Sequence, residues 1–288
     1  MEFRTTVSIP ASTWKVEPHH QLLFVGSCFA DNIGKRFSDN MFLTTVNPFG
    51  VMYNPASVLH TLERMYADEA SAFAAPDVAV LSLGTNHVYI LNETGEIVDN
   101  CEKRPQRLFT EKELTVEECT DYLTRCVNLL QQVNPAIRII FTVSPIRYAK
   151  YGFHESQLSK ATLLMAINTL LSSLNPALPL HDTKNYQLST VNCQLIYFPS
   201  YEIVLDELRD YRFYASDMLH PSEQAVDYIY ERFAETFFSE KTRRFVEDYR
   251  PIKQALNHRP FNPDSEEYRK FIDQTKEKLE AFKARYQR

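Results

Sequence analysis

Residues 21–30, QLLFVGSCFA, place an apolar run directly before a glycine and a helical pattern directly after it. The short run ending at Gly26 predicts a buried β-strand over 21–25, and the spacing of Phe29, Ile33 and Phe37 predicts a helix over 28–37. The chain has only six glycines in 288 residues, so each is expected where a side chain is not tolerated. A strand, a glycine turn and a helix in succession indicate the start of an α/β fold.

The same alternation continues along the chain. Strand-like runs are found at 42–46, 78–83, 137–143 and 194–198. Each is followed by a helical stretch, at 56–66, 116–133, 157–174 and 222–238. The helix at 116–133 opens with a capping box formed by Thr115 and Glu118. Strands separated by helices at this rhythm predict a parallel sheet with helices on both faces.

Two segments interrupt the alternation. The first twenty residues show no clear periodicity and are expected to form an entry arm or an edge strand. Two short apolar runs flank an Asn-Glu-Thr-Gly turn at about 87–100 and predict a hairpin inserted after the strand at 78–83. Insertions at this position often shape a substrate pocket.

The composition changes near the C-terminus. Residues 239–288 are charged and helical, and a capping box of Asp264 with Glu267 is expected to open the last helix. The chain is therefore expected to divide into a domain over 1–238 and a helical extension over 239–288. The extension either packs on the domain or supports self-association.

Charge and cysteine usage narrow the function classes. A net charge of −6 argues against a nucleic-acid or anionic-membrane partner, because both need a basic surface. No stretch is long and apolar enough to span a membrane and the start is not a signal peptide, so a cytoplasmic location is expected. Five cysteines without a C-x-x-C pair predict reduced thiols. No metal-ligand cluster or glycine-rich phosphate loop occurs, so no cofactor is expected.

Four polar signatures stand at the ends of predicted elements. They are Gly26-Ser27-Cys28, Asn47-Pro48-Phe49-Gly50, Gly84-Thr85-Asn86-His87 and Asp217-Met218-Leu219-His220-Pro221. The first three each follow a predicted strand, and the carboxyl ends of parallel strands meet at one edge of the sheet, where ligands bind. Each residue alone has an ordinary structural reading, such as a turn or a cap. Their joint occurrence in this order favours a shared site.

The residue types suit acyl transfer. Cys28 or Ser27 would be the nucleophile at the first turn of a helix, where the helix dipole favours a thiolate or alkoxide. His220 would be the general base, and Asp217 would orient its imidazole.

The remaining candidates would bind the substrate or its oxyanion. Backbone N–H groups beside Gly26 and Gly50, the Gly84 turn and the Asn86 carboxamide could donate hydrogen bonds to a developing oxyanion. Arg147 follows the predicted strand at 137–143 and could orient an anionic or hydroxylated substrate.

The four signatures resemble the sequence blocks of the SGNH (GDSL-like) hydrolase superfamily. Within it, Gly26-Ser27-Cys28-Phe29-Ala30 spells the signature of the GSCFA family, and the resemblance spans roughly residues 20 to 238. It implies a three-layer, flavodoxin-like fold with a five-stranded parallel sheet. The superfamily has Gly-Asp-Ser in its first block, so an ungapped alignment puts Cys28 in the nucleophile's place, whereas a slip of one residue makes Ser27 the nucleophile.

The resemblance and the residues together predict an esterase or acyltransferase. Its substrate would be a small acyl ester, with a carbohydrate alcohol suggested by the superfamily alone. Two alternatives remain open: a non-catalytic binding or scaffold protein on a degenerate SGNH fold, and a Cys28-dependent thiol transferase. The sequence does not decide the oligomeric state.

Overall fold

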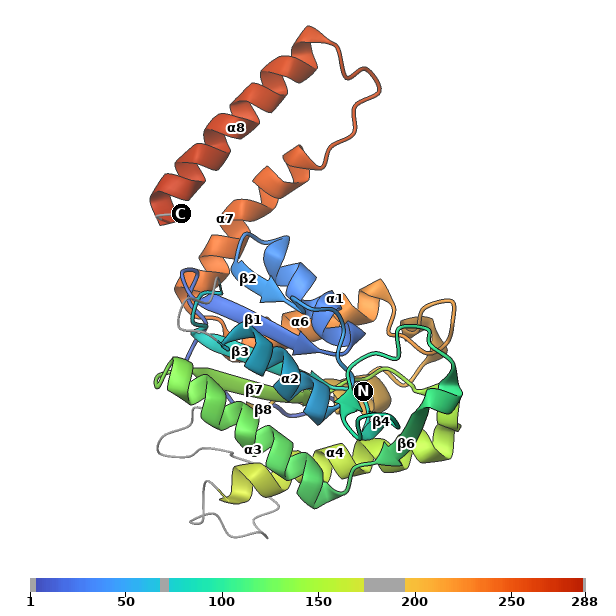
Figure 1. Ribbon diagram of the computed structural model, residues 1–288. Helices are drawn as coiled ribbons and strands as arrows, with labels where there is room; N and C mark the ends of the chain where they lie inside the picture. Colours follow the sequence, from blue (N-terminus) through green and yellow to red (C-terminus); the bar gives the residue numbers. More distant parts are fainter. Residues whose placement is uncertain (1–3, 68–72, 174–194, 287–288) are drawn as a thin grey trace.

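The centre of the structure is a five-stranded sheet in the order β2-β1-β3-β7-β8, with every neighbouring pair parallel (Figure 1). The computed structural model describes residues 4–67, 73–173 and 195–286. The strands are β1 (Gln21–Gly26), β2 (Leu43–Val46), β3 (Val78–Leu83), β7 (Arg138–Val143) and β8 (Leu195–Tyr197). This is the flavodoxin-like strand order, so the predicted α/β class is confirmed.

Helices cover both faces of the sheet because successive side chains of each strand point to opposite sides. Leu22 and Phe24 of β1 belong to one core cluster, and Leu23 and Val25 belong to the other. The first cluster includes α1 (Cys28–Ser38) and α6 (Glu223–Phe237). The second includes α2 (Pro55–Met65), α3 (Val116–Val133) and α4 (Phe153–Ser173). The result is a three-layer α/β/α arrangement.

A second, antiparallel sheet follows β3. Its order is β5-β4-β6, with β4 (His87–Leu91), β5 (Ile97–Val98) and β6 (Phe109–Glu113). The predicted hairpin is therefore present, and it is extended by a third strand that the sequence analysis missed. β6 reads FTEKE, and such a polar strand lacks the apolar signal of a core strand.

The N-terminal residues form an arm and not an edge strand of the main sheet. The Val16 N–H donates to the Phe237 carbonyl at 2.7 Å, and Thr242 Oγ1 donates to the Val16 carbonyl at 2.6 Å. Farther out, the Val7 N–H donates to the buried Glu207 carboxylate at 3.0 Å. The arm is thus held against the end of α6, the first turn of the helix that follows α6, and the buried Glu207.

The C-terminal region consists of α7 (Glu240–Leu256) and α8 (Glu266–Tyr286), which extend together from the α/β body (Figure 1). The ring of Phe245 packs on Phe282 at a centroid distance of 5.0 Å and on Phe42 of the body at 5.3 Å. The predicted Asp264 capping box is wrong: Ser265 precedes α8, and its Oγ accepts from the Tyr268 N–H at 3.2 Å. Asp264 lies one residue too early to cap this helix.

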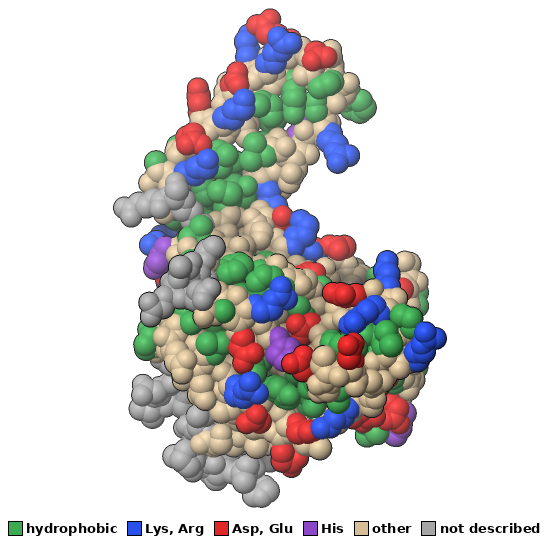
Figure 2. Space-filling model, viewed as in Figure 1, with side chains coloured by type: hydrophobic (Ala, Val, Ile, Leu, Met, Phe, Trp, Pro, Cys, Tyr) green, Lys and Arg blue, Asp and Glu red, His purple; other side chains and the backbone are tan. Residues whose placement is uncertain are grey.

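Short helical segments complete the chain. They are α5 (Ser200–Glu202), η1 (Gln106–Leu108), η2 (Ala149–Tyr151), η3 (Ile203–Glu207) and η4 (Tyr211–Phe213). Acidic and basic side chains are interspersed over the face of the body in Figure 2, and apolar side chains gather along the C-terminal helices. Among the described helices, none combines the length and apolarity needed to cross a membrane.

Candidate active site

The loops that follow β1, β2 and β3 are joined by direct hydrogen bonds. The Gly26 N–H donates to Asn47 Oδ1 at 2.8 Å, and the Met52 N–H donates to the Gly26 carbonyl at 2.8 Å. The Tyr53 carbonyl then accepts from the N–H groups of Gly84 and Thr85 at 2.8 and 2.9 Å. The first three signatures therefore meet at the carboxyl edge of the sheet, as predicted.

The fourth signature reaches the same edge through the loop after β7. The Arg147 N–H donates to the Leu219 carbonyl at 3.0 Å, and Arg147 Nη1 donates to the Met218 carbonyl at 3.1 Å. Met218 has a positive φ of 59°, a conformation that is costly for a side chain of this size. The two hydrogen bonds from Arg147 hold the 217–220 loop in this conformation and fix the position of His220.

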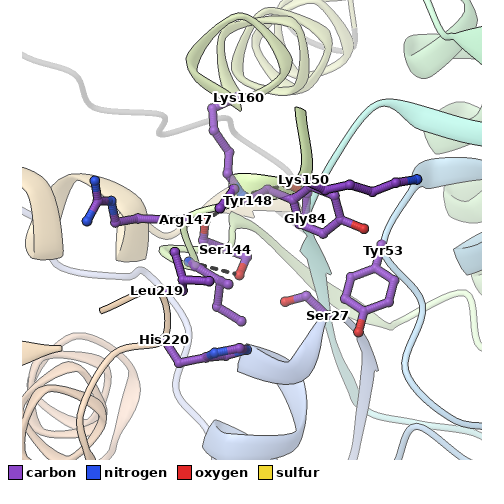
Figure 3. Close-up of a pocket in the computed structure, with 12 residues that line it drawn as sticks. Ser27, Tyr53, Gly84, Ser144, Arg147, Tyr148, Lys150, Lys160, Leu219 and His220 are labelled. Atoms are coloured by element: carbon purple, nitrogen blue, oxygen red, sulfur yellow. Dashed lines mark hydrogen bonds between the residues drawn. The ribbon is translucent and has the colours of Figure 1, made fainter. Parts of the chain in front are cut away.

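These loops surround a cavity of about 220 Å³. In Figure 3 the Ser27 hydroxyl and the His220 ring both point into this space. The residues lining the cavity are Ser27, Tyr53, Gly84, Ser144, Ile146, Arg147, Tyr148, Ala149, Lys150, Lys160, Leu219 and His220. Side chains from distant signatures thus share one cavity.

Asp217 and His220 form a hydrogen-bonded pair, with 2.6 Å between Oδ2 and Nδ1. The other carboxylate oxygen accepts from the N–H groups of Leu219 and His220 at 2.9 and 3.0 Å. The hydrogen bonds from the His220 and Leu219 backbone, together with that from the imidazole, lower the pKa of Asp217 to about 2. Because an ionised carboxylate only accepts, neutral His220 carries its proton on Nδ1, which leaves Nε2 able to accept a proton.

Gly26 allows the turn between β1 and α1. Its φ is +141°, and a Cβ at this position would lie 2.0 Å from the Ser82 carbonyl oxygen. The next residue uses that closeness, because the Ser27 N–H donates to the Ser82 carbonyl at 3.0 Å. The glycine is therefore required by the backbone of the neighbouring strand β3.

The structure separates the surroundings of Ser27 and Cys28. Ser27 is the N-cap of α1: its Oγ accepts from the Phe29 N–H at 3.2 Å and lies 3.0 Å from Ser82 Oγ. Ser27 is only 1% exposed. Cys28 is the first residue of the helix and half-buried, and its Sγ lies 3.5 Å from the Tyr53 hydroxyl. The hydroxyl has a structural role in capping, whereas the thiol has no comparable backbone role.

Of the three predicted oxyanion donors outside the first block, Gly84 lines the cavity, whereas Gly50 and Asn86 lie away from it. The Gly50 N–H donates to the Asn47 carbonyl at 2.8 Å, and this glycine is exposed. Asn86 is buried, and its Nδ2 donates to the Leu114 carbonyl at 2.8 Å, while the Leu114 N–H donates back to the Asn86 carbonyl at 2.9 Å. Neither residue lines the cavity. Their oxyanion roles stay predictions, as does that of the N–H beside Gly26.

Arg147 lines the cavity, but its guanidinium has other contacts. It lies 4.1 Å from the centroid of the Phe153 ring and 5.6 Å from that of Tyr214, in addition to its bond to the 217–220 loop. In Figure 3 the guanidinium extends away from Ser27. The structure therefore gives Arg147 a role in anchoring the loop, and its substrate role stays a prediction.

The sequence analysis missed Lys160, which is 2% exposed and lines the cavity. Its Nζ donates to the Gly84 carbonyl at 2.6 Å and to the Ser144 carbonyl at 2.9 Å, which ties together the ends of β3 and β7. A signal was present, because Lys160 falls at helical spacing with the buried Leu163 and Ile167. A lysine on the apolar stripe of a helix needs a polar partner inside the fold.

Burial lowers the pKa of Lys160 to about 7 from its ordinary value of 10.5. Between these two values the unfolded chain binds a proton that the folded protein lacks, so stability should rise with pH. We expect the unfolding free energy of wild type, measured relative to that of Lys160→Met, to increase by a few kcal/mol between about pH 7 and pH 10. This amount follows from the pKa difference, because each pKa unit corresponds to about 1.4 kcal/mol. Urea denaturation at both pH values measures it.

The matched control is Lys276→Met, which removes an exposed lysine of α8. Its effect on the unfolding free energy should be the same at both pH values. A pH-independent difference for Lys160→Met would contradict the assignment of Lys160 as a lysine that burial keeps largely neutral in this range.

No group of His, Cys, Asp and Glu side chains suited to a metal ion occurs within the described residues. The polar side chains that line the cavity are hydroxyls, phenols, an imidazole and basic groups: Ser27, Ser144, Tyr53, Tyr148, His220, Arg147, Lys150 and Lys160.

Among solved structures, the chain is similar to an acetyl esterase variant with an acetate ion (9% identity, TM-score 0.44), covering 80% of this chain and 99% of that one. It is also similar to a carbohydrate esterase family 3 protein from Talaromyces cellulolyticus (9%, TM-score 0.41; 80% and 99% covered). A third is an acetyl xylan esterase from Butyrivibrio proteoclasticus (13%, TM-score 0.41; 80% and 64% covered).

Sequence comparisons identify the family. No curated protein sequence matches the chain. The GSCFA family model matches residues 21–74 and 69–233, and the model of the C-terminal domain of GSCFA domain proteins matches residues 250–288. These matches cover the four signatures and most of the chain, and the protein therefore belongs to the GSCFA family.

Proposed function

We propose that this protein is an esterase or acyltransferase that forms a covalent acyl intermediate on Cys28. The observation that supports it most strongly is the hydrogen-bonded Asp217–His220 pair, which opens onto the same cavity as the N-terminus of α1. The proposed nucleophile Cys28 lies far in sequence from the loop that carries both the base His220 and the orienting carboxylate Asp217. His220 lines this cavity together with Ser27, the N-cap residue next to Cys28, and a purely structural use of the two loops would not require that.

The proposed reaction starts with attack of Cys28 Sγ on the carbonyl carbon of an ester, while the thiol proton passes to His220 Nε2. The tetrahedral intermediate collapses, the bond to the alcohol oxygen breaks, and His220 returns the proton to that oxygen. Water or an acceptor hydroxyl then attacks the thioester and loses its proton to His220. The acyl group leaves, and the proton returns to the Cys28 sulfur.

The cavity indicates a small acyl group. Its volume of about 220 Å³ lies below the range of drug-sized ligand sites, roughly 300–1,000 Å³. Acetyl or a similarly short acyl group therefore fits the proposal best. A carbohydrate as the alcohol part follows from the family resemblance alone.

Hydrolysis of p-nitrophenyl acetate by His220→Ala tests the proposal. We expect kcat to fall by roughly 10²–10⁴ because general-base catalysis is lost. The control is His154→Ala, which removes an exposed histidine of α4 and should leave kcat unchanged. Equal turnover by His220→Ala and wild type would sink the assignment of the base. Turnover at the uncatalysed background in both proteins would favour the alternative of a binding or scaffold protein.

A further inference from the structure

We propose that the Tyr53 hydroxyl donates the hydrogen bond that stabilises the oxyanion formed when Cys28 attacks its substrate. This inference rests on the proposed acyl-transfer function and names a residue that the sequence analysis did not single out. Acyl transfer needs a donor aimed at the oxygen on which negative charge develops. Two of the predicted donors are not placed to do this, because Gly50 and Asn86 lie away from the cavity and both already donate to carbonyl groups.

Tyr53 occupies a suitable position. Its hydroxyl lies 3.5 Å from Cys28 Sγ, and its side chain lines the cavity beside Ser27 (Figure 3). In the tetrahedral intermediate, the same carbon is bonded to Sγ and to the oxyanion oxygen, so only this carbon separates the sulfur from that oxygen. A hydroxyl in contact with the resting sulfur can therefore move its hydrogen bond to that oxygen without a change in the backbone.

The backbone of Tyr53 is fixed independently of its side chain. Its carbonyl accepts both N–H groups of the Gly84-Thr85 turn, at 2.8 and 2.9 Å. Gly84 lets the two backbones approach, since a Cβ there would lie only 3.2 Å from the Tyr53 carbonyl oxygen. The third signature thus fixes the backbone that carries the phenol, which gives Gly84 a role in the site that differs from direct donation.

The surroundings keep Tyr53 protonated. Burial raises the pKa of its phenol, and the hydrogen bond with Cys28 and the neighbouring Tyr148 raise it further. A phenol that stays neutral where a thiol ionises remains a hydrogen-bond donor in the working pH range. This protonation state is the one that oxyanion stabilisation requires.

Tyr53→Phe tests the inference, because it removes the hydroxyl and keeps the ring. We expect kcat for p-nitrophenyl acetate to fall by roughly 10²–10³, the usual cost of losing one oxyanion donor. Tyr66→Phe is the matched control: it removes a phenol at the end of α2 and should leave kcat unchanged. A kcat for Tyr53→Phe within about twofold of wild type would overturn the inference.

Alkylation by iodoacetamide separates this role from positioning of the thiol. The reaction occurs at a saturated carbon and forms no oxyanion, so Tyr53→Phe should alkylate at Cys28 at least as fast as wild type. Equal losses in alkylation and in ester turnover would mean that Tyr53 only positions the sulfur, and would also overturn the inference. Cys28→Ala is assayed alongside. If it keeps full turnover, the proposed function fails; if only Tyr53→Phe keeps it, the function stands without Tyr53.

Discussion

Cys28→Ala is expected to lower kcat for p-nitrophenyl acetate by at least about 10³, because the proposed acyl intermediate forms on the Cys28 sulfur. Ser27→Ala should lower kcat by less than about tenfold. The Ser27 hydroxyl caps α1, and loss of an N-cap typically costs about 1 kcal/mol of folding stability. A 10³-fold loss of kcat corresponds to about 4 kcal/mol of activation free energy, which is a much larger effect. Steady-state turnover and urea denaturation of the two variants measure both effects.

The control for Ser27 is Ser239→Ala. Ser239 is the N-cap of α7, and its Oγ accepts from the Thr242 N–H at 3.1 Å, outside the cavity. Both serine variants should lose similar unfolding free energy. A loss of turnover of 10³ in Ser27→Ala, with Cys28→Ala still active, would move the nucleophile to Ser27 and leave the base assignment intact.

Gly26→Ala should cost on the order of 3 kcal/mol or more of unfolding free energy. The added Cβ would lie 2.0 Å from the Ser82 carbonyl oxygen, and that atom belongs to the backbone of central strand β3, which cannot move aside without breaking the sheet. The φ of +141° adds backbone strain. Thermal and urea unfolding of the variant measure the loss.

Gly50→Ala separates the two contributions. Gly50 also has a positive φ, of 94°, but no atom lies within 4 Å of the position a Cβ would take. Its substitution should cost only the conformational strain, about 1–2 kcal/mol. Equal losses in the two variants would show that the contact with β3 is unimportant.

Much of the main fold could be predicted because its elements carry strong local signals. The apolar runs of β1 and β3 and the capping box of α3 each define an element, and the strand order follows from the family resemblance. Weak signals failed. The polar strand β6 has no apolar alternation, and Ser265 could not be distinguished from Asp264 as a cap when both precede the same helix.

The sequence could predict which signatures meet at the candidate site, but it could not predict which way individual side chains point. Local sequence places Asp217 three residues before His220, and a pair at that spacing can hydrogen-bond within one loop. Whether Asn86 faces the cavity or the small sheet depends on the partner that tertiary structure brings to it, which here is Leu114. Tyr53 was missed for the same reason, whereas the position of Lys160 on the apolar stripe of α4 was a local signal that was overlooked. The domain boundary at residue 238 stays a prediction.

The pairing of Asn86 with Leu114 has a consequence for how the protein tolerates change. Residues 87–113 leave the body and return to it at two positions that are tied to each other, by a backbone bond and a side-chain bond. The segment between them is therefore a loop whose two ends are joined by hydrogen bonds. A change in the length of this segment should therefore leave the turn that carries Gly84 in its present shape, because the two bonds between Asn86 and Leu114 do not depend on the residues between them.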